Sequence, residues 1–257
     1  MVEVYPDIEA LSRAAAQLFA DQARRAVRER GRFLALLSGG DTPGPSYRLL
    51  AQEPLRGSIP WQDVHLFWGD ERWVPLDDPH SNYLLARQTF IDAVPLAPSQ
   101  VHPVPFEASP RLSAARYEEL LRGFFRGAPP RFDLALQGLG DNGHTASLFP
   151  GSSALNETAR WVCETNQPHQ GLYRVTLTPQ VINQAALVVF LVAGARKAAV
   201  LRRVLEEGAD PAELPARAIR PDKGTLLWLV DREAARLLDQ RLVHDRSGGP
   251  GEGASSI

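Results

Sequence analysis

The hydrophobic residues of the chain fall into two kinds of segment. Residues 8–30 place Ile8, Leu11 and further apolar residues among alanines and charges, and Gly31 follows them. This spacing predicts a long amphipathic helix that ends at the glycine. Elsewhere the apolar residues form short, nearly continuous runs, which are typical of buried strands. These runs lie at 33–37, 64–68, 132–136 and 187–192.

Each apolar run leads into a polar or glycine-rich turn. The turns begin at Ser38, Gly69, Gly138 and Gly194, and helical patterns separate the runs. Buried strands that alternate with helices predict an α/β fold with a mostly parallel, Rossmann-like open sheet and helices on both faces. Ligands of such sheets bind outside the carboxyl ends of the strands. We therefore expect the four turns to converge on one site.

The same pattern suggests a single domain. The chain has 257 residues, a length that one α/β domain can reach. A further helix is predicted around 112–126, between proline-rich loops at 95–110 and 129–130, and no repeat of fixed period is present. We expect one α/β domain over residues 1–246. The glycine- and serine-rich tail at 247–257 is predicted to be disordered.

Composition excludes several functional classes. The net charge of −2 argues against nucleic-acid binding through a broadly basic surface. Cys163 is the only cysteine, so no internal disulfide can form, and no histidine pair has metal-ligand spacing. No secretory signal and no apolar run of membrane-spanning length are visible. We expect a cytoplasmic protein that needs no metal or other cofactor and binds a small molecule; the pattern does not indicate the oligomeric state.

The turn at 38–43 is a candidate phosphate loop. It reads Ser-Gly-Gly-Asp-Thr-Pro between a predicted strand and a predicted helix. Glycines there let the backbone approach an anion, and the free N–H groups of a helix start bind phosphate. The Lys-Ser/Thr pair of a Walker loop is missing. A tight strand-to-helix turn without a ligand has the same signature.

The turn at 138–143 formally matches the dinucleotide pattern G-x-G-x-x-G. It follows a strand in the middle of the chain, and Pro150 interrupts the helix that a dinucleotide site requires, so NAD(P) binding is disfavoured. His144, which comes next, can titrate near neutrality and serve as a general base. A structural role is the alternative interpretation for a lone loop histidine.

Two cations are candidate partners for a bound anion. Arg174 lies on a predicted strand, and Lys197 lies in the first turn of a predicted helix. A lysine at a helix N-terminus opposes the helix dipole, and a bound anion would explain it. The segment Asp70-Glu71-Arg72 follows a buried strand, where an ordinary solvated turn is the simpler interpretation.

Together these segments resemble the 6-phosphogluconolactonase family, whose relatives are glucosamine-6-phosphate deaminases and isomerases. The resemblance extends to about Arg241, and its most specific block is Gly-His-Thr-Ala-Ser-Leu-Phe-Pro at 143–150. The other blocks are 38–43, 70–75, 81–83, 138–140, 174–176, Gly194 with Lys197, 214–216 and 227–231.

The resemblance implies hydrolysis of 6-phospho-D-glucono-1,5-lactone to 6-phosphogluconate, a step of the oxidative pentose phosphate pathway. His144 would act as general base on water, and Asp70 and Asp141 are further candidate catalytic residues. Substrate and phosphate would be bound by residues of the glycine-rich loops and by basic side chains. These residues are Ser38, Gly39, Gly40, Asp41, Thr42, Arg72, Gly143, Arg174 and Lys197. No role is assigned to the Asp41 side chain.

Two alternatives stay open. The first is a deaminase or isomerase, but those relatives carry carboxylates where this chain has Asn142 and Phe149. Lactonases also often have aspartate at the position of Asn142, so a charge role there is in doubt, and the neighbouring Asp141 is a candidate to compensate. The second is a sugar-phosphate sensor without turnover, which would need a DNA-binding module that the chain leaves no room for.

Overall fold

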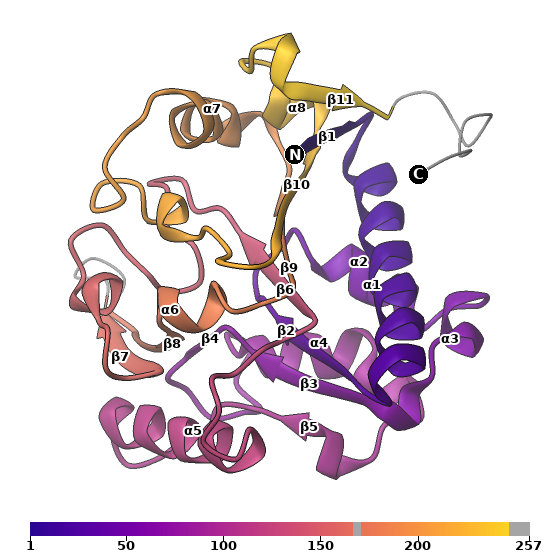
Figure 1. Ribbon diagram of the computed structural model, residues 1–257, viewed down its shortest axis with the longest axis vertical. Helices are drawn as coiled ribbons and strands as arrows, with labels where there is room; N and C mark the ends of the chain where they lie inside the picture. The colour runs from indigo at the N-terminus through magenta and orange to yellow at the C-terminus, as the bar shows by residue number, and fades with distance from the viewer. Residues whose placement is uncertain (167–170, 247–257) are drawn as a thin grey trace.

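The computed structural model describes residues 1–166 and 171–246, and its main feature is an eight-stranded sheet (Figure 1). Every neighbouring pair in this sheet is parallel. The spatial order is β11 (Val243–Asp245), β1 (Val2–Tyr5), β10 (Thr225–Asp231), β9 (Leu187–Val192), β6 (Leu134–Gly138), β2 (Phe33–Leu37), β3 (Val64–Trp68) and β5 (Val101–His102). The predicted α/β fold with an open parallel sheet is confirmed.

Helices cover both faces of the sheet. α1 (Ile8–Arg30) begins at Asp7, whose side chain accepts a hydrogen bond from Ala10 N–H, and ends at Gly31 with φ of 72°. It lies with α2 (Gly44–Leu50) and α3 (Leu55–Ser58) on one side, whereas α6 (Pro179–Ile182) and α7 (Ala198–Glu206) lie on the other (Figure 1). The remaining helices are α4 (Asn82–Thr89), α5 (Pro110–Phe124) and α8 (Arg232–Ala235).

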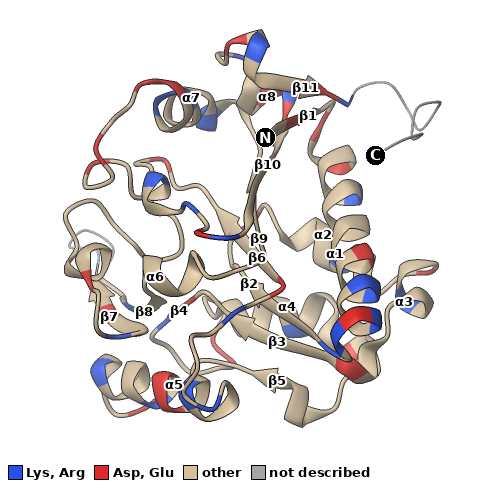
Figure 2. Cartoon of the chain, in the orientation of Figure 1, with Lys and Arg blue, Asp and Glu red and all other residues tan. Residues whose placement is uncertain are grey.

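Charged residues avoid the central strands. Figure 2 shows the strands of the sheet almost entirely tan, with basic and acidic residues interspersed on helices and loops. This is the pattern expected of a sheet buried on both faces. Within 1–166 and 171–246, no helix is long and apolar enough to span a membrane. The tail predicted at 247–257 lies outside the described residues.

A second, three-stranded antiparallel sheet packs beside the first. Its order is β4 (Asp70–Arg72), β8 (Tyr173–Leu177) and β7 (Val162–Asn166). The segment Asp70–Arg72, interpreted from sequence as a turn, is therefore a strand. After Gly69 the chain leaves the main sheet and pairs with β8, which places Arg72 directly opposite Arg174. The pairing links segments about a hundred positions apart in the sequence, which local patterns cannot reveal.

Two buried tyrosines fix the carboxyl ends of β2 and β3, where the chain turns out of the main sheet. The Tyr47 hydroxyl accepts from Ser38 N–H at 3.1 Å and donates to Ser38 C=O at 2.8 Å. The Tyr117 hydroxyl accepts from Trp68 N–H at 2.9 Å and donates to Trp68 C=O at 3.0 Å. Buried backbone groups need such partners. The two tyrosines therefore hold the backbone at the base of the candidate site.

Candidate active site

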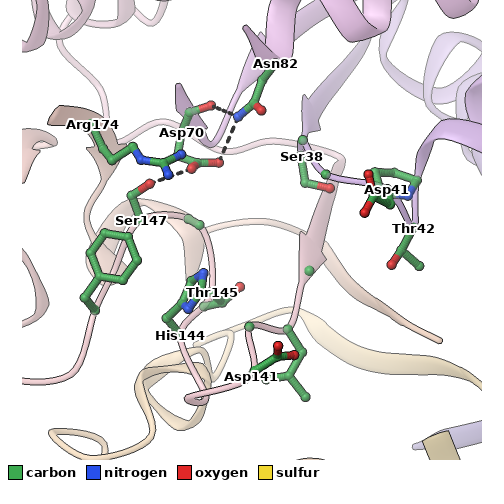
Figure 3. A pocket seen from close by; sticks show the side chains of 18 of the residues that line it. Ser38, Asp41, Thr42, Asp70, Asn82, Asp141, His144, Thr145, Ser147 and Arg174 are labelled. Carbon is green, nitrogen blue, oxygen red and sulfur yellow. Dashed lines mark hydrogen bonds between the residues drawn. The ribbon is translucent and has the colours of Figure 1, made fainter. Parts of the chain in front are cut away.

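The turns at the carboxyl ends of the strands converge on one pocket of about 300 Å³, as the sequence predicted. It lies within the size range of small-molecule sites. Figure 3 shows Ser38, Asp41 and Thr42 on one side, Asp70, Asn82 and Arg174 on another, and His144 with Asp141 below them. Of the residues singled out from sequence, those on the pocket wall are Ser38, Gly39, Gly40, Asp41, Thr42, Asp70, Arg72, Asp141, His144, Arg174 and Lys197.

Gly143 is the predicted site residue that does not line the pocket. Its φ is +80°, and a Cβ there would lie 2.5 Å from Leu214 Cδ2. Its carbonyl accepts from Ala216 N–H at 2.9 Å. The glycine allows the chain to turn tightly against the 214–216 segment, directly before the histidine.

The loop at 38–42 presents backbone and an unpaired hydroxyl to the pocket. Ser38 is 7% exposed, and among the described residues its Oγ has no hydrogen-bond partner. A Cβ on Gly39 would lie 1.8 Å from Asn82 Oδ1, so only glycine fits against that side chain. Buried polar groups are normally satisfied, which makes the Ser38 hydroxyl a candidate ligand contact.

His144 is held in one orientation and one tautomer. Asn142 Oδ1 lies 2.5 Å from His144 Nδ1 and also accepts from the His144 backbone N–H at 3.3 Å. An oxygen that accepts from both groups places the ring proton on Nδ1 and leaves the lone pair on Nε2. A Cβ on Gly140 would lie 2.0 Å from the imidazole, so the ring rests against bare backbone.

Burial keeps the imidazole neutral. The pKa of His144 is lowered from 6.5 to about 4, and burial is the largest cause; Lys197 and Arg174 also lower it, whereas Asp70 and Asp141 raise it. The Phe149 ring packs against the imidazole with centroids 4.8 Å apart. At neutral pH His144 is thus an uncharged base with a free nitrogen.

Asp70 is a buried carboxylate held by neutral donors. Its side chain accepts from Ser147 Oγ at 2.6 Å and from Asn82 Nδ2 at 3.4 Å, and the same amide donates to the Asp70 carbonyl at 2.9 Å. Figure 3 shows the Arg174 guanidinium beside this group. Because Ser147 belongs to the segment that follows His144, its hydrogen bond ties the histidine loop to β4.

Glu71 organises the other side of β4. Its Oε1 accepts from the backbone N–H groups of Arg72 and Asn82 at 2.8 and 2.7 Å. Its Oε2 accepts from Tyr83 N–H at 2.8 Å and from Ser81 Oγ at 3.0 Å. Burial raises the pKa of Glu71 to about 7, against the backbone donors, which lower it. The carboxylate thereby fixes the start of α4 and the Asn82 side chain within the pocket.

The Asp141 carboxylate, a candidate catalytic group from sequence, hydrogen-bonds to the Lys197 ammonium. The Lys197 side chain is 10% exposed, whereas that of Asp141 is 65% exposed. Lys197 ends the short 3₁₀ turn Ala195–Lys197 that precedes α7. The hydrogen bond lowers the pKa of Asp141, which therefore remains charged. Across 1–166 and 171–246, no cluster of acidic, histidine or cysteine residues that could hold a metal is present.

Comparison with known proteins places this arrangement in a family. The model described as glucosamine-6-phosphate isomerases/6-phosphogluconolactonase matches residues 6–228. The chain belongs to this family. A Nostoc member named 6-phosphogluconolactonase is 43% identical over 237 residues, 91% of this chain and 96% of the relative. A Synechocystis member of the same name is 44% identical over 218 residues, 83% and 88% of the two chains.

The family's solved structures share the fold. The 6-phosphogluconolactonase of Trypanosoma brucei superposes with a TM-score of 0.79 at 30% identity, covering 93% of this chain and 98% of that one. Ten residues on the pocket wall have no site role assigned from sequence: Pro43, Asn82, Gly138, Leu139, Gly140, Thr145, Ala146, Ser147, Phe149 and Arg196. All except Arg196 lie within the motif blocks on which the resemblance rested, and that was the signal available for them.

Proposed function

We propose that this member of the family hydrolyses 6-phospho-D-glucono-1,5-lactone to 6-phosphogluconate, with His144 as the general base. The observation that carries the proposal is the neutral imidazole, its Nδ1 bound to Asn142 and its Nε2 left for the reaction. The names of the Nostoc and Synechocystis relatives support the same substrate. We also propose that residues 1–246 form a single domain, because one hydrophobic core joins both sheets.

In the proposed reaction, Nε2 of His144 removes a proton from a water molecule as its oxygen attacks the lactone carbonyl carbon. The tetrahedral intermediate then collapses, the bond from that carbon to the ring oxygen breaks, and the imidazolium returns the proton to the ring oxygen. The low pKa of the imidazole suits this second step, because a histidine that holds its proton weakly gives it up readily. Asn142 keeps the proton on Nδ1 throughout.

The phosphate group of the substrate would bind between the 38–42 loop and the cations of the pocket. Lys197 and Arg174 line it from different elements, so together they fix the position of a dianion. Asp70 is a suitable acceptor for substrate hydroxyls. Arg72, which donates to the His80 carbonyl, lies two residues further along β4. Holding the phosphate at one end orients the lactone carbonyl relative to His144.

The surroundings of the histidine favour a hydrolase over a deaminase. Amino-sugar ring opening and isomerisation need further proton-transferring carboxylates near the base. Here an amide, Asn142, contacts Nδ1 and the apolar ring of Phe149 packs against the imidazole. Hydrolysis of an activated lactone requires only the base and a positioned carbonyl.

The proposal is tested with lactone generated freshly from glucose 6-phosphate. Its decay is followed with and without the protein, and spontaneous hydrolysis is subtracted. Gluconolactone without the phosphate serves as the matched substrate, and glucosamine 6-phosphate is assayed for ammonia release. Faster decay of the phosphorylated lactone alone supports the proposal. Decay at the spontaneous rate, or release of ammonia from the amino sugar, would overturn it.

A further inference from the structure

The Asp141–Lys197 pair places a carboxylate where an anionic ligand is expected. Lys197 is one of two lysines in the chain, its side chain is 10% exposed, and its ammonium group contacts Asp141. Arg196 Nε lies 4.0 Å from the same carboxylate oxygen. All three residues line the pocket, so the Asp141 carboxylate pairs with cationic groups that would face a bound substrate.

Asp141 is held differently from the other carboxylate of the pocket. Asp70 is 8% exposed and accepts hydrogen bonds from the neutral side chains of Ser147 and Asn82, which fix it in the wall. Asp141 is largely exposed, and its carboxylate contacts the cations Lys197 and Arg196. Figure 3 shows the two carboxylates on different sides of the pocket. An exposed side chain can leave its partner at little cost, whereas a buried network cannot.

Lys197 does not need Asp141 to stay in place. Its backbone N–H bonds to the Gly194 carbonyl at 3.0 Å, and its stem is packed so that only 10% of the side chain is exposed. A side chain that is buried to this extent and lines the pocket has little freedom to move, so we infer that the carboxylate adds little preorganisation. The remaining effect of Asp141 on a second anion at Lys197 is competition and repulsion.

We propose that Asp141 is an internal competitor of the substrate phosphate: its carboxylate occupies Lys197 in the empty enzyme and is displaced when a phosphorylated ligand binds. The residue thus sets an upper limit on affinity for phosphorylated substrate and product, and does not take part in the chemical step. This inference rests on the proposed function, in which Lys197 contacts the phosphate.

The experiment measures affinity and catalysis in Asp141→Asn and Asp141→Glu. Dissociation constants for 6-phosphogluconate and for inorganic phosphate are obtained by titration calorimetry, and KM and kcat from lactone hydrolysis, at low and high salt. Asp92→Asn is the matched control, since it also removes an aspartate paired with an arginine, Arg87 at 3.1 Å, on a surface away from the pocket. Asp141→Glu keeps the charge.

Asp141→Asn is expected to lower Kd and KM about fivefold at low salt, the size expected of one unit charge about 4 Å away in water. The gain should shrink at high salt, where exposed charges are screened. Asp141→Glu and Asp92→Asn should stay near the wild type, and kcat should change by less than about threefold in all variants. In the Lys197→Met background, Asp141→Asn should improve binding by less than about twofold, because the contested cation is gone.

Three results would overturn the proposal. Weaker phosphate binding in Asp141→Asn would mean that the carboxylate preorganises Lys197. A loss of kcat of about a hundredfold at unchanged KM would make Asp141 a catalytic group. An undiminished gain in the Lys197→Met background would show that Asp141 acts by general repulsion. Failure of the proposed function is distinct: the wild type would not hydrolyse the lactone, whereas titration with inorganic phosphate would still report the competition.

Discussion

The two walls of the pocket are stabilised in opposite ways. The clamp wall, made of Asp70, Glu71 and Asn82, consists of buried polar groups that bond to one another and to backbone. The histidine wall, made of residues 138–144 with Lys197, has a neutral base at its centre and, at its rim, an ion pair between a buried lysine and an exposed aspartate. The Ser147–Asp70 hydrogen bond joins the two.

The clamp wall holds groups in place, whereas the histidine wall contains a contact that a ligand can replace. A buried carboxylate with all its acceptor sites occupied holds one geometry, because any rearrangement leaves a donor unpaired. In the Asp141–Lys197 pair the carboxylate is exposed, so a ligand anion can take its place beside the ammonium. We therefore expect changes in the clamp wall to alter stability and geometry together, and changes in the histidine wall to alter catalysis or affinity in a folded protein.

The largest effect is expected from His144→Gln. It removes the base while keeping a side chain of similar length, so kcat should fall by about 10²–10⁴-fold, the usual contribution of a general base. Binding of 6-phosphogluconate, measured by calorimetry, should change little. Near-normal turnover in His144→Gln would show that the base lies elsewhere in the pocket.

Gly140→Ala tests how closely the histidine wall must hold the imidazole. The added Cβ would lie 2.0 Å from two atoms of the ring, so the ring has to move. A displacement of about 1 Å can cost about a hundredfold in rate, and we expect kcat to fall by about 10- to 100-fold. Gly123→Ala in α5, where a Cβ meets nothing within 4 Å, is the control. A fully active Gly140→Ala would mean that the ring tolerates displacement.

Local patterns were sufficient for the layers of this fold and not for the clamp wall. The helix at 8–30 and the strands at 33–37, 64–68 and 187–192 have the predicted bounds, because their periodicity and stop signals are encoded within each segment. β4 is three residues long and mostly charged, and it is a strand only because it pairs with β8. The hydrophobic periodicity of the sequence cannot predict such a strand.

The pocket shows the same division. The glycine loops and His144 stand out in sequence because few residues suit a strand end that approaches a ligand. The contacts that decide their roles are long-range: Ser147 meets Asp70 across 77 positions, and Lys197 meets Asp141 across 56. The sequence names Asp141 as a candidate to compensate for Asn142, and no local pattern indicates that its carboxylate bonds to a lysine on another turn.

Glu71→Gln breaks the clamp wall. Each carboxylate oxygen accepts two hydrogen bonds, so an amide NH₂ in place of either oxygen faces two donors. We expect the free energy of unfolding to fall by about 2–4 kcal/mol, because the donors that face the amide NH₂ lose their acceptor.

Below the unfolding transition of Glu71→Gln, kcat/KM should also fall, by about tenfold, because Asn82 and with it Asp70 lose their positions. Urea titration and lactone kinetics on the same sample provide both numbers. Glu119→Gln, which breaks an exposed pair with Arg116, should stay within about 0.5 kcal/mol of the wild type. An equal loss of stability in both variants would remove the distinction between the walls.

The smallest effect expected concerns the pKa of His144. Because burial lowers it from 6.5 to about 4, the imidazole stays neutral as pH falls from neutrality to about 5, and the base is lost only as pH drops through about 4. The substrate phosphate titrates near pH 6, which obscures this limb in kcat/KM. The cleaner measurement is an NMR titration of the imidazole in the unliganded protein, assigned with His144→Gln.

Lys197 lowers the pKa of His144 and Asp141 raises it, so Lys197→Met should shift it upward and Asp141→Asn downward, each by less than burial does. A titration midpoint of His144 near pH 6.5 in the wild type would mean that water reaches the ring freely. Burial would then not be the reason why the imidazole is neutral at pH 7. Shifts of the same sign in the two variants would show that the ion pair reaches the histidine through rearrangement of the loop, since charge alone requires opposite signs.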